Sequence, residues 1–120
     1  LVLQSTMCFI YLYNMKVENT KAQMRKGVLE MCILGMAAKQ EVYPSDIINK
    51  LKESELIVVE GTLYPLLSRL KKAGLVDYSW KESNAGPPRK YYRTTEEGKT
   101  FLLTLKNNWT QLVNAVDQTT

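Results

Sequence analysis

Two short runs of alternating apolar and polar residues, separated by a turn-rich segment, constrain the fold of this chain more than any other feature. Apolar or aromatic side chains stand at every second position in residues 75–81, and residues 89–94 form a second run with strand-like composition. Residues 82–88 between them read ESNAGPP, a composition typical of turns. We therefore expect a β-hairpin with a loop of seven residues. The tip of this hairpin is flanked by three cationic side chains, those of Lys81, Arg89 and Lys90.

Helical patterns fill the chain before the hairpin. Residues 20–39 contain no proline and become apolar on nearly all sides, which predicts one buried central helix. A second helix is expected to begin at Pro44 or Ser45, because proline is favoured in the first turn, and to end within residues 53–55.

A third helix is predicted from residue 60 or 61 to Ala73. Gly74 follows as a suitable C-terminal cap, and Pro65 is expected in or near the first turn, where a missing N–H costs least. The apolar residues have the spacing i, i+3, i+4, i+7 of an amphipathic helix: Leu63, Leu66, Leu67 and Leu70. This stripe should anchor the helix to the core and leave its other face in solvent.

The C-terminal segment predicts one long helix, capped by Thr94 or Thr95. Its apolar positions are spaced 3, 4, 3, 4, as in a heptad seam. A single terminal helix has too little chain around it to cover such a seam, which leaves the seam open to a partner. The predicted interface residues are Leu102, Leu105, Trp109, Leu112 and Val116.

Composition argues against an enzyme. The 120 residues include no histidine, which excludes Ser-His-Asp and Cys-His hydrolases and nearly every catalytic zinc site. The two cysteines, Cys8 and Cys32, are too few for a thiolate metal site and are interpreted as reduced. The sequence also lacks a glycine-rich phosphate loop. We therefore expect no catalytic residue, no metal and no cofactor.

Positive charge is concentrated in one part of the chain. The net charge of the whole chain is +4, whereas residues 61–93 alone carry seven Lys or Arg and two Asp or Glu. A localised basic block favours a polyanionic partner, although a merely lysine-rich surface is the alternative.

Residues 1–14 fit neither a transmembrane helix nor a secretory signal. Their apolar run is much shorter than the roughly 20 residues that span a bilayer, and no basic segment precedes it. We expect these residues to be an upstream or added extension, with Met15 or Met24 near the natural start. The expected protein is cytoplasmic, without a membrane partner.

The order of three helices and a basic hairpin is that of a winged helix-turn-helix, expected here over residues 20–94, with a dimerisation helix over residues 95–120. The predicted fold is mainly α with a small β-hairpin. In this arrangement the third helix enters the major groove of double-stranded DNA. The predicted DNA-binding residues are Thr62, Tyr64, Ser68, Arg69, Lys72, Lys81, Arg89 and Lys90. A winged helix that binds only proteins, with no specific operator, is the alternative.

Two longer motifs resemble one family. Residues 61–70, GTLYPLLSRL, followed by KAGLV at residues 72–76, resemble the recognition-helix signature of PadR transcriptional regulators. Residues 86–93, GPPRKYYR, and TEEG at residues 95–98 resemble the second signature of that family. The single C-terminal helix resembles the small PadR subclass.

The resemblance implies a homodimeric repressor whose C-terminal helix makes the dimer. Because the two recognition helices of such a dimer must reach major grooves about one helical turn apart, we expect a pseudo-palindromic operator. In the small subclass, a tryptophan on the C-terminal helix lines a flat pore at the dimer interface and stacks on aromatic ligands, and Trp109 falls at that position. We therefore expect a planar hydrophobic effector at Trp109, with Met24 and Met31 as further candidates. The alternatives are that Trp109 is an interface core residue and that both methionines belong to the core.

Overall fold

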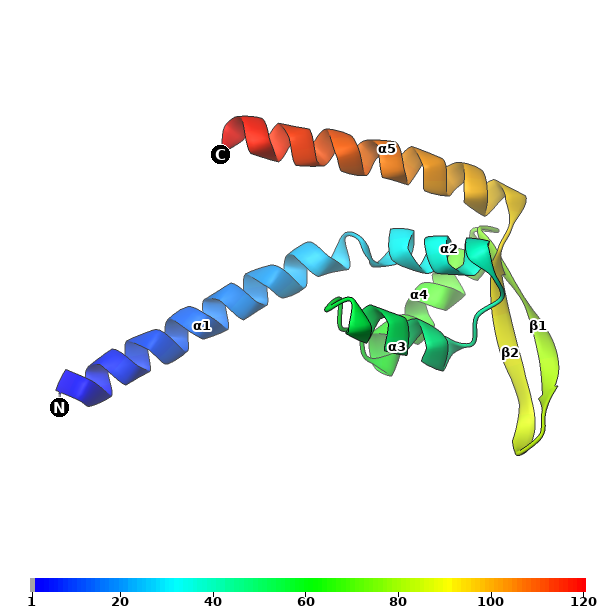
Figure 1. The fold of residues 1–120 in the computed structure, drawn as a ribbon, viewed down its shortest axis with the longest axis horizontal. Coiled ribbons are helices and arrows are strands. Elements are labelled where there is room, and N and C mark those ends of the chain that lie inside the picture. The colour runs from blue at the N-terminus through cyan, green and yellow to red at the C-terminus, as the bar shows by residue number, and fades with distance from the viewer. Residues whose placement is uncertain (1) are drawn as a thin grey trace.

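The structure of the protein is a computed structural model that describes residues 2–120 (Figure 1). It is mainly helical with one antiparallel hairpin, as the sequence predicts. The elements in chain order are α1 (Val2–Lys26), α2 (Leu29–Lys39), α3 (Pro44–Glu53), α4 (Glu60–Lys72), β1 (Val76–Ser83), β2 (Gly86–Thr94) and α5 (Glu96–Thr119).

The core lies where α2, α3, α4 and the base of the hairpin meet. The leucine stripe of α4 points into it: Leu63, Leu67 and Leu70 are buried and Leu66 is half-buried. Burying each such side chain stabilises the fold by about 1.5–3 kcal/mol. The stripe thereby fixes which face of α4 remains in solvent. The other fully buried side chains are Ile33, Leu34, Ile47 and Val76.

The first predicted helix is corrected by the structure. Instead of one helix over residues 20–39, α1 ends at Lys26, a turn follows at Gly27 and Val28, and α2 begins at Leu29. Glycine is a poor helix former, which makes this a suitable place for a break. The break lets α2 turn into the core while α1, which begins at Val2, extends away from the body (Figure 1).

Pro65 lies deeper in its helix than predicted. It is the sixth residue of α4, beyond the first turn. A proline there removes one backbone hydrogen bond and crowds the carbonyl of the residue four positions earlier. That residue is Gly61, which has no Cβ and an adaptable backbone.

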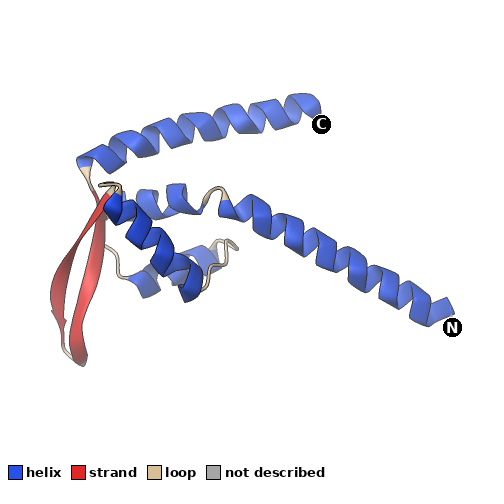
Figure 2. Cartoon of the chain, turned by 180° about the vertical axis from the view of Figure 1, so that it is seen from behind, coloured by secondary structure: helices blue, strands red, loops and turns tan. Residues whose placement is uncertain are grey.

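The hairpin is longer and its loop shorter than predicted. Only Asn84 and Ala85 lie between the strands, and the register pairs Lys81 with Arg89 and Ser83 with Gly86 across an irregularity. Pro87 and Pro88 therefore belong to β2. One of these two adjacent prolines has its nitrogen on the free edge of the strand, and the other lies at the irregularity between Lys81 and Ser83, where the ladder is interrupted. Figure 2 shows the hairpin on one side of the helical body and the free ends of α1 and α5 on the other.

α5 starts from a close contact with the core. The Thr95 hydroxyl accepts a hydrogen bond from the Gly98 N–H at 3.0 Å and donates one to the Gly74 carbonyl at 2.7 Å. A Cβ on Gly98 would lie 2.0 Å from the Leu75 carbonyl oxygen, so only glycine fits there. Farther along, α5 leaves the body, and every residue after Leu105 is exposed. Among the described residues, no helix has the length and apolar content required to cross a membrane.

Candidate nucleic-acid interface

A groove of about 420 Å³ runs between the exposed face of α4, the start of α3 and the hairpin. Tyr64 and Ser68 contribute the α4 wall, while Arg89 and Lys90 contribute the hairpin wall. The structure thus brings together four of the predicted DNA-binding residues from two elements. Hydroxyl and cationic side chains of this kind contact phosphates and base edges.

Aromatic rings support the cations on the hairpin. The Arg89 guanidinium lies 4.8 Å from the centre of the Tyr43 ring. The Lys90 ammonium lies 4.4 Å from the centre of the Tyr78 ring and 5.2 Å from that of Trp80. Such contacts restrict flexible side chains without neutralising them. The two cations therefore keep their charge for a phosphate.

Tyr43 is a groove residue that the sequence reasoning missed. The chain before it pairs with the hairpin, because the Val42 N–H donates to the Tyr92 carbonyl at 2.9 Å and the Tyr92 N–H donates to the Val42 carbonyl at 2.8 Å. This bridge places Tyr43 beside Arg89 and 5.8 Å, ring to ring, from Tyr91. No local sequence pattern signals a pairing between such distant segments.

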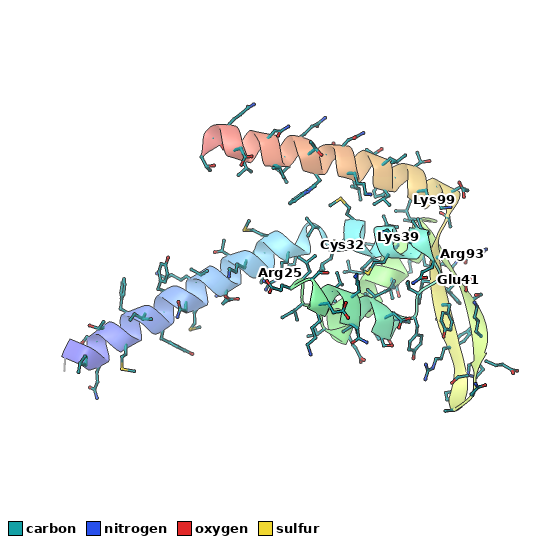
Figure 3. All side chains as sticks on the ribbon, in the orientation of Figure 1. Arg25, Cys32, Lys39, Glu41, Arg93 and Lys99 are labelled. Atoms are coloured by element: carbon teal, nitrogen blue, oxygen red, sulfur yellow. The ribbon has the colours of Figure 1, made fainter. Side chains whose placement is uncertain are left out.

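The Lys81 ammonium forms an ion pair with Glu41 and lies 5.2 Å from the centre of the Tyr91 ring. Figure 3 shows Glu41 where the chain leaves α2 and passes the base of the hairpin. This ion pair therefore connects the hairpin to the segment after α2, and the Glu41 carboxylate partly neutralises the charge of Lys81.

Arg69 points to another side of α4 than the groove. At about 100° per residue, it lies about 140° around the helix from Tyr64. Its guanidinium forms an ion pair with Glu30 in the first turn of α2. Tyr64 and Arg69 thus lie toward opposite edges of one wide exposed face of α4. The other two predicted contacts, Thr62 and Lys72, are exposed and lie outside the groove residues.

The pKa of the Tyr64 hydroxyl is raised above its ordinary value. Burial, the Glu60 carboxylate and Tyr43 each raise the pKa of Tyr64. A tyrosine hydroxyl is protonated at neutral pH even at its ordinary pKa of about 10, so Tyr64 can donate a hydrogen bond to a phosphate or a base acceptor.

A second groove, of about 570 Å³, lies between α5 and the junction of α1 with α2. Here the structure brings together the three predicted effector residues, Met24, Met31 and Trp109. Four of the predicted dimer residues line the same groove: Leu105, Trp109, Leu112 and Val116. Leu102 is the exception, because it is buried in the core of its own chain and has little surface left for a partner.

Comparison with known proteins identifies the family. The family model described as "Transcriptional regulator PadR-like family" matches residues 33–104, more than half of the chain. The chain belongs to this family. The match includes α4 and the hairpin. The groove between them therefore lies on the winged helix of a DNA-binding transcription regulator. The protein is a regulator and not an enzyme.

Solved structures agree with this assignment. A PadR-like transcription factor from Bacteroides fragilis is 55% identical, with 85% of this chain and 99% of that chain covered and a TM-score of 0.71. A PadR family regulator from Eggerthella lenta is 30% identical, with 90% and 95% covered and a TM-score of 0.84. A PadR-like regulator from Bacillus cereus is 40% identical, with 80% and 94% covered and a TM-score of 0.70.

Proposed function

We propose that this PadR-family protein is a homodimeric, cytoplasmic repressor that binds a pseudo-palindromic operator. The observation that carries this proposal is the groove whose lining includes Tyr64 and Ser68 of α4 and Arg89 and Lys90 of the hairpin. A recognition helix and a cationic hairpin on one groove can read the major groove while the hairpin contacts the adjacent backbone.

The exposed half of α5 supports the dimer. Trp109, Leu112 and Val116 are 45%, 56% and 48% exposed and lie on one side of a helix that the chain itself does not cover. A contiguous apolar surface of this kind is typical of a protein–protein interface. A two-fold dimer formed there would present two α4 helices, and the operator would mirror that symmetry.

The groove beside Trp109 supports relief of repression by a planar hydrophobic effector. Its volume of about 570 Å³ falls within the range of roughly 300–1,000 Å³ common for small-molecule sites. A ligand that binds better to one spacing of the two α5 helices would shift the dimer toward that spacing. Because α5 follows directly from the hairpin, the two α4 helices would then lose register with the operator.

DNA upstream of the protein's own gene is a suitable probe for the interface. With that duplex, the combined variant Arg89→Ala and Lys90→Ala should bind more weakly, and the slope of log affinity against log salt should flatten by about two units, one for each phosphate that the variant no longer neutralises. Fluorescence anisotropy over a salt series measures both quantities.

Lys106→Ala is the matched control, because Lys106 is an exposed cation on α5, away from the groove. It should leave the affinity and the slope unchanged. If the double variant behaved like this control, the assignment of the hairpin to DNA would be wrong. If the wild-type protein showed no preference for this duplex over unrelated DNA, a specific site there would be contradicted.

A further inference from the structure

Glu30 takes part both in the groove beside Trp109 and in an ion pair with α4. It lines the groove between α5 and the α1–α2 junction. Its carboxylate also forms the ion pair with Arg69 on α4, the helix assigned to DNA recognition. One carboxylate therefore connects the groove around Trp109 with the recognition helix.

The charges of this groove are of one sign. Its lining is apolar except for Asn108 and two carboxylates, Glu30 on α2 and Asp117 on α5, and it includes no Lys or Arg. The Trp109 indole lies in the same lining. An indole face attracts cations as well as apolar rings, and the two carboxylates add to that attraction.

The ion pair that holds Glu30 is open to water. The Arg69 side chain is 66% exposed and that of Glu30 is 30% exposed. Exposed ion pairs of this kind contribute little net stability. A second cation that approaches from the groove can therefore take over the carboxylate at small cost.

We propose that Glu30 determines the specificity of the groove, selecting planar organic cations in competition with Arg69. This inference rests on the proposed effector site and adds the charge of the ligand to it. A bound cation frees Arg69 from α2, so occupancy of the groove is transmitted to α4 through this side chain.

Two probes of the same shape isolate the charge. N-methylquinolinium and 1-methylnaphthalene are both planar bicyclic molecules with one methyl group, and only the first carries a positive charge. Their affinities for the full chain, measured by calorimetric titration without DNA, should differ in favour of the cation by roughly tenfold, the effect of one charge-assisted contact. Glu30→Gln should remove most of this preference.

Arg69→Gln tests the competition directly. Because it frees Glu30, it should raise the affinity for N-methylquinolinium several-fold and leave that for 1-methylnaphthalene unchanged. The gain should disappear when Glu30→Gln is also present. With Asp117→Asn as the matched control, the gain should persist, because Asp117 has no ion pair with Arg69 in the described structure.

The proposal is overturned if Glu30→Gln keeps the preference for the cation, or if Arg69→Gln gives the same gain without Glu30. Failure of both probes to bind the wild-type protein also overturns it, and is the result expected if a second copy of the chain fills the groove. Operator binding and sedimentation on the same samples then show whether the dimeric regulator survives this failure.

Discussion

The winged core, formed by α2, α3, α4 and the hairpin, buries its large apolar side chains, whereas helices α1 and α5 leave many of theirs exposed to solvent. In the core, the leucines of α4 are covered by α2, α3 and the hairpin, and Leu63 and Leu67 are at most 1% exposed. On α1 and the far half of α5, large apolar side chains remain in solvent; Met24 is 72% exposed. The first region is complete as a single chain, whereas the second is suited to a partner or a ligand.

A core leucine should give the largest effect. Leu67→Ala removes a buried side chain from α4 and leaves a cavity, so the free energy of unfolding should fall by about 3 kcal/mol, within the range of 2–5 kcal/mol for such changes. Leu103→Ala on α5, where the leucine is 65% exposed, should change it by less than about 0.5 kcal/mol. Urea denaturation measures both values. Equal losses would remove the contrast between the two regions.

A charge on the exposed half of α5 should separate the subunits without unfolding the chain. Leu112→Asp would bury an unpaired carboxylate in the proposed interface, at a cost of at least about 2 kcal/mol, or roughly thirtyfold in the dissociation constant. Analytical ultracentrifugation should show monomers, while circular dichroism keeps the helical signal.

Asn107→Asp is the control for added charge, because Asn107 is an exposed α5 residue outside the groove lining. It should remain dimeric. A Leu112→Asp protein that still sedimented as a dimer would exclude this face as the interface.

The start of α5 joins the two regions, and its cap should contribute a smaller amount. Thr95→Ala removes the acceptor for the Gly98 N–H and the donor to the Gly74 carbonyl, so stability should fall by about 1 kcal/mol. Thr95→Ser retains the hydroxyl and should recover most of the loss in thermal denaturation. A serine variant as unstable as the alanine variant would show that the methyl group, not the hydroxyl, matters.

The sequence predicts the elements whose signals are local. The stripe of α4, the cap at Thr95 and the alternation before Lys81 each lie within a few residues, and the structure confirms α4, α5 and the hairpin. The break at Gly27 was missed because the helical pattern continues on both sides of it. The strand through Pro87 was missed because a turn-rich composition does not reveal which edge of a sheet is free.

The candidate site shows the same limit. The sequence indicates which side chains of α4 are exposed, but not that Arg69 pairs with Glu30 or that Lys81 pairs with Glu41. These pairs join residues far apart in the chain, and their geometry depends on how α2 packs against α4 and the hairpin. The roles of Thr62 and Lys72 in DNA binding stay predictions.

The smallest expected effect concerns pH and lies at the base of the hairpin. A hydrogen bond from the Tyr78 N–H and the nearby Lys71 ammonium, 3.3 Å away, lower the pKa of Asp77 below its usual value. A carboxyl whose pKa is lowered by folding stabilises the fold above its unfolded pKa, about 3.9, and loses this contribution as the pH falls through the folded value.

Asp77→Asn should therefore lose stability relative to the wild type at neutral pH, with the difference shrinking below about pH 4. Denaturation across pH 2–7 measures it, and Glu82→Gln on the same strand, whose carboxylate has no ion pair in the described structure, should show no such trend. A difference between wild type and Asp77→Asn that stayed constant down to the lowest pH would show that the carboxylate of Asp77 does not stabilise the hairpin through its charge.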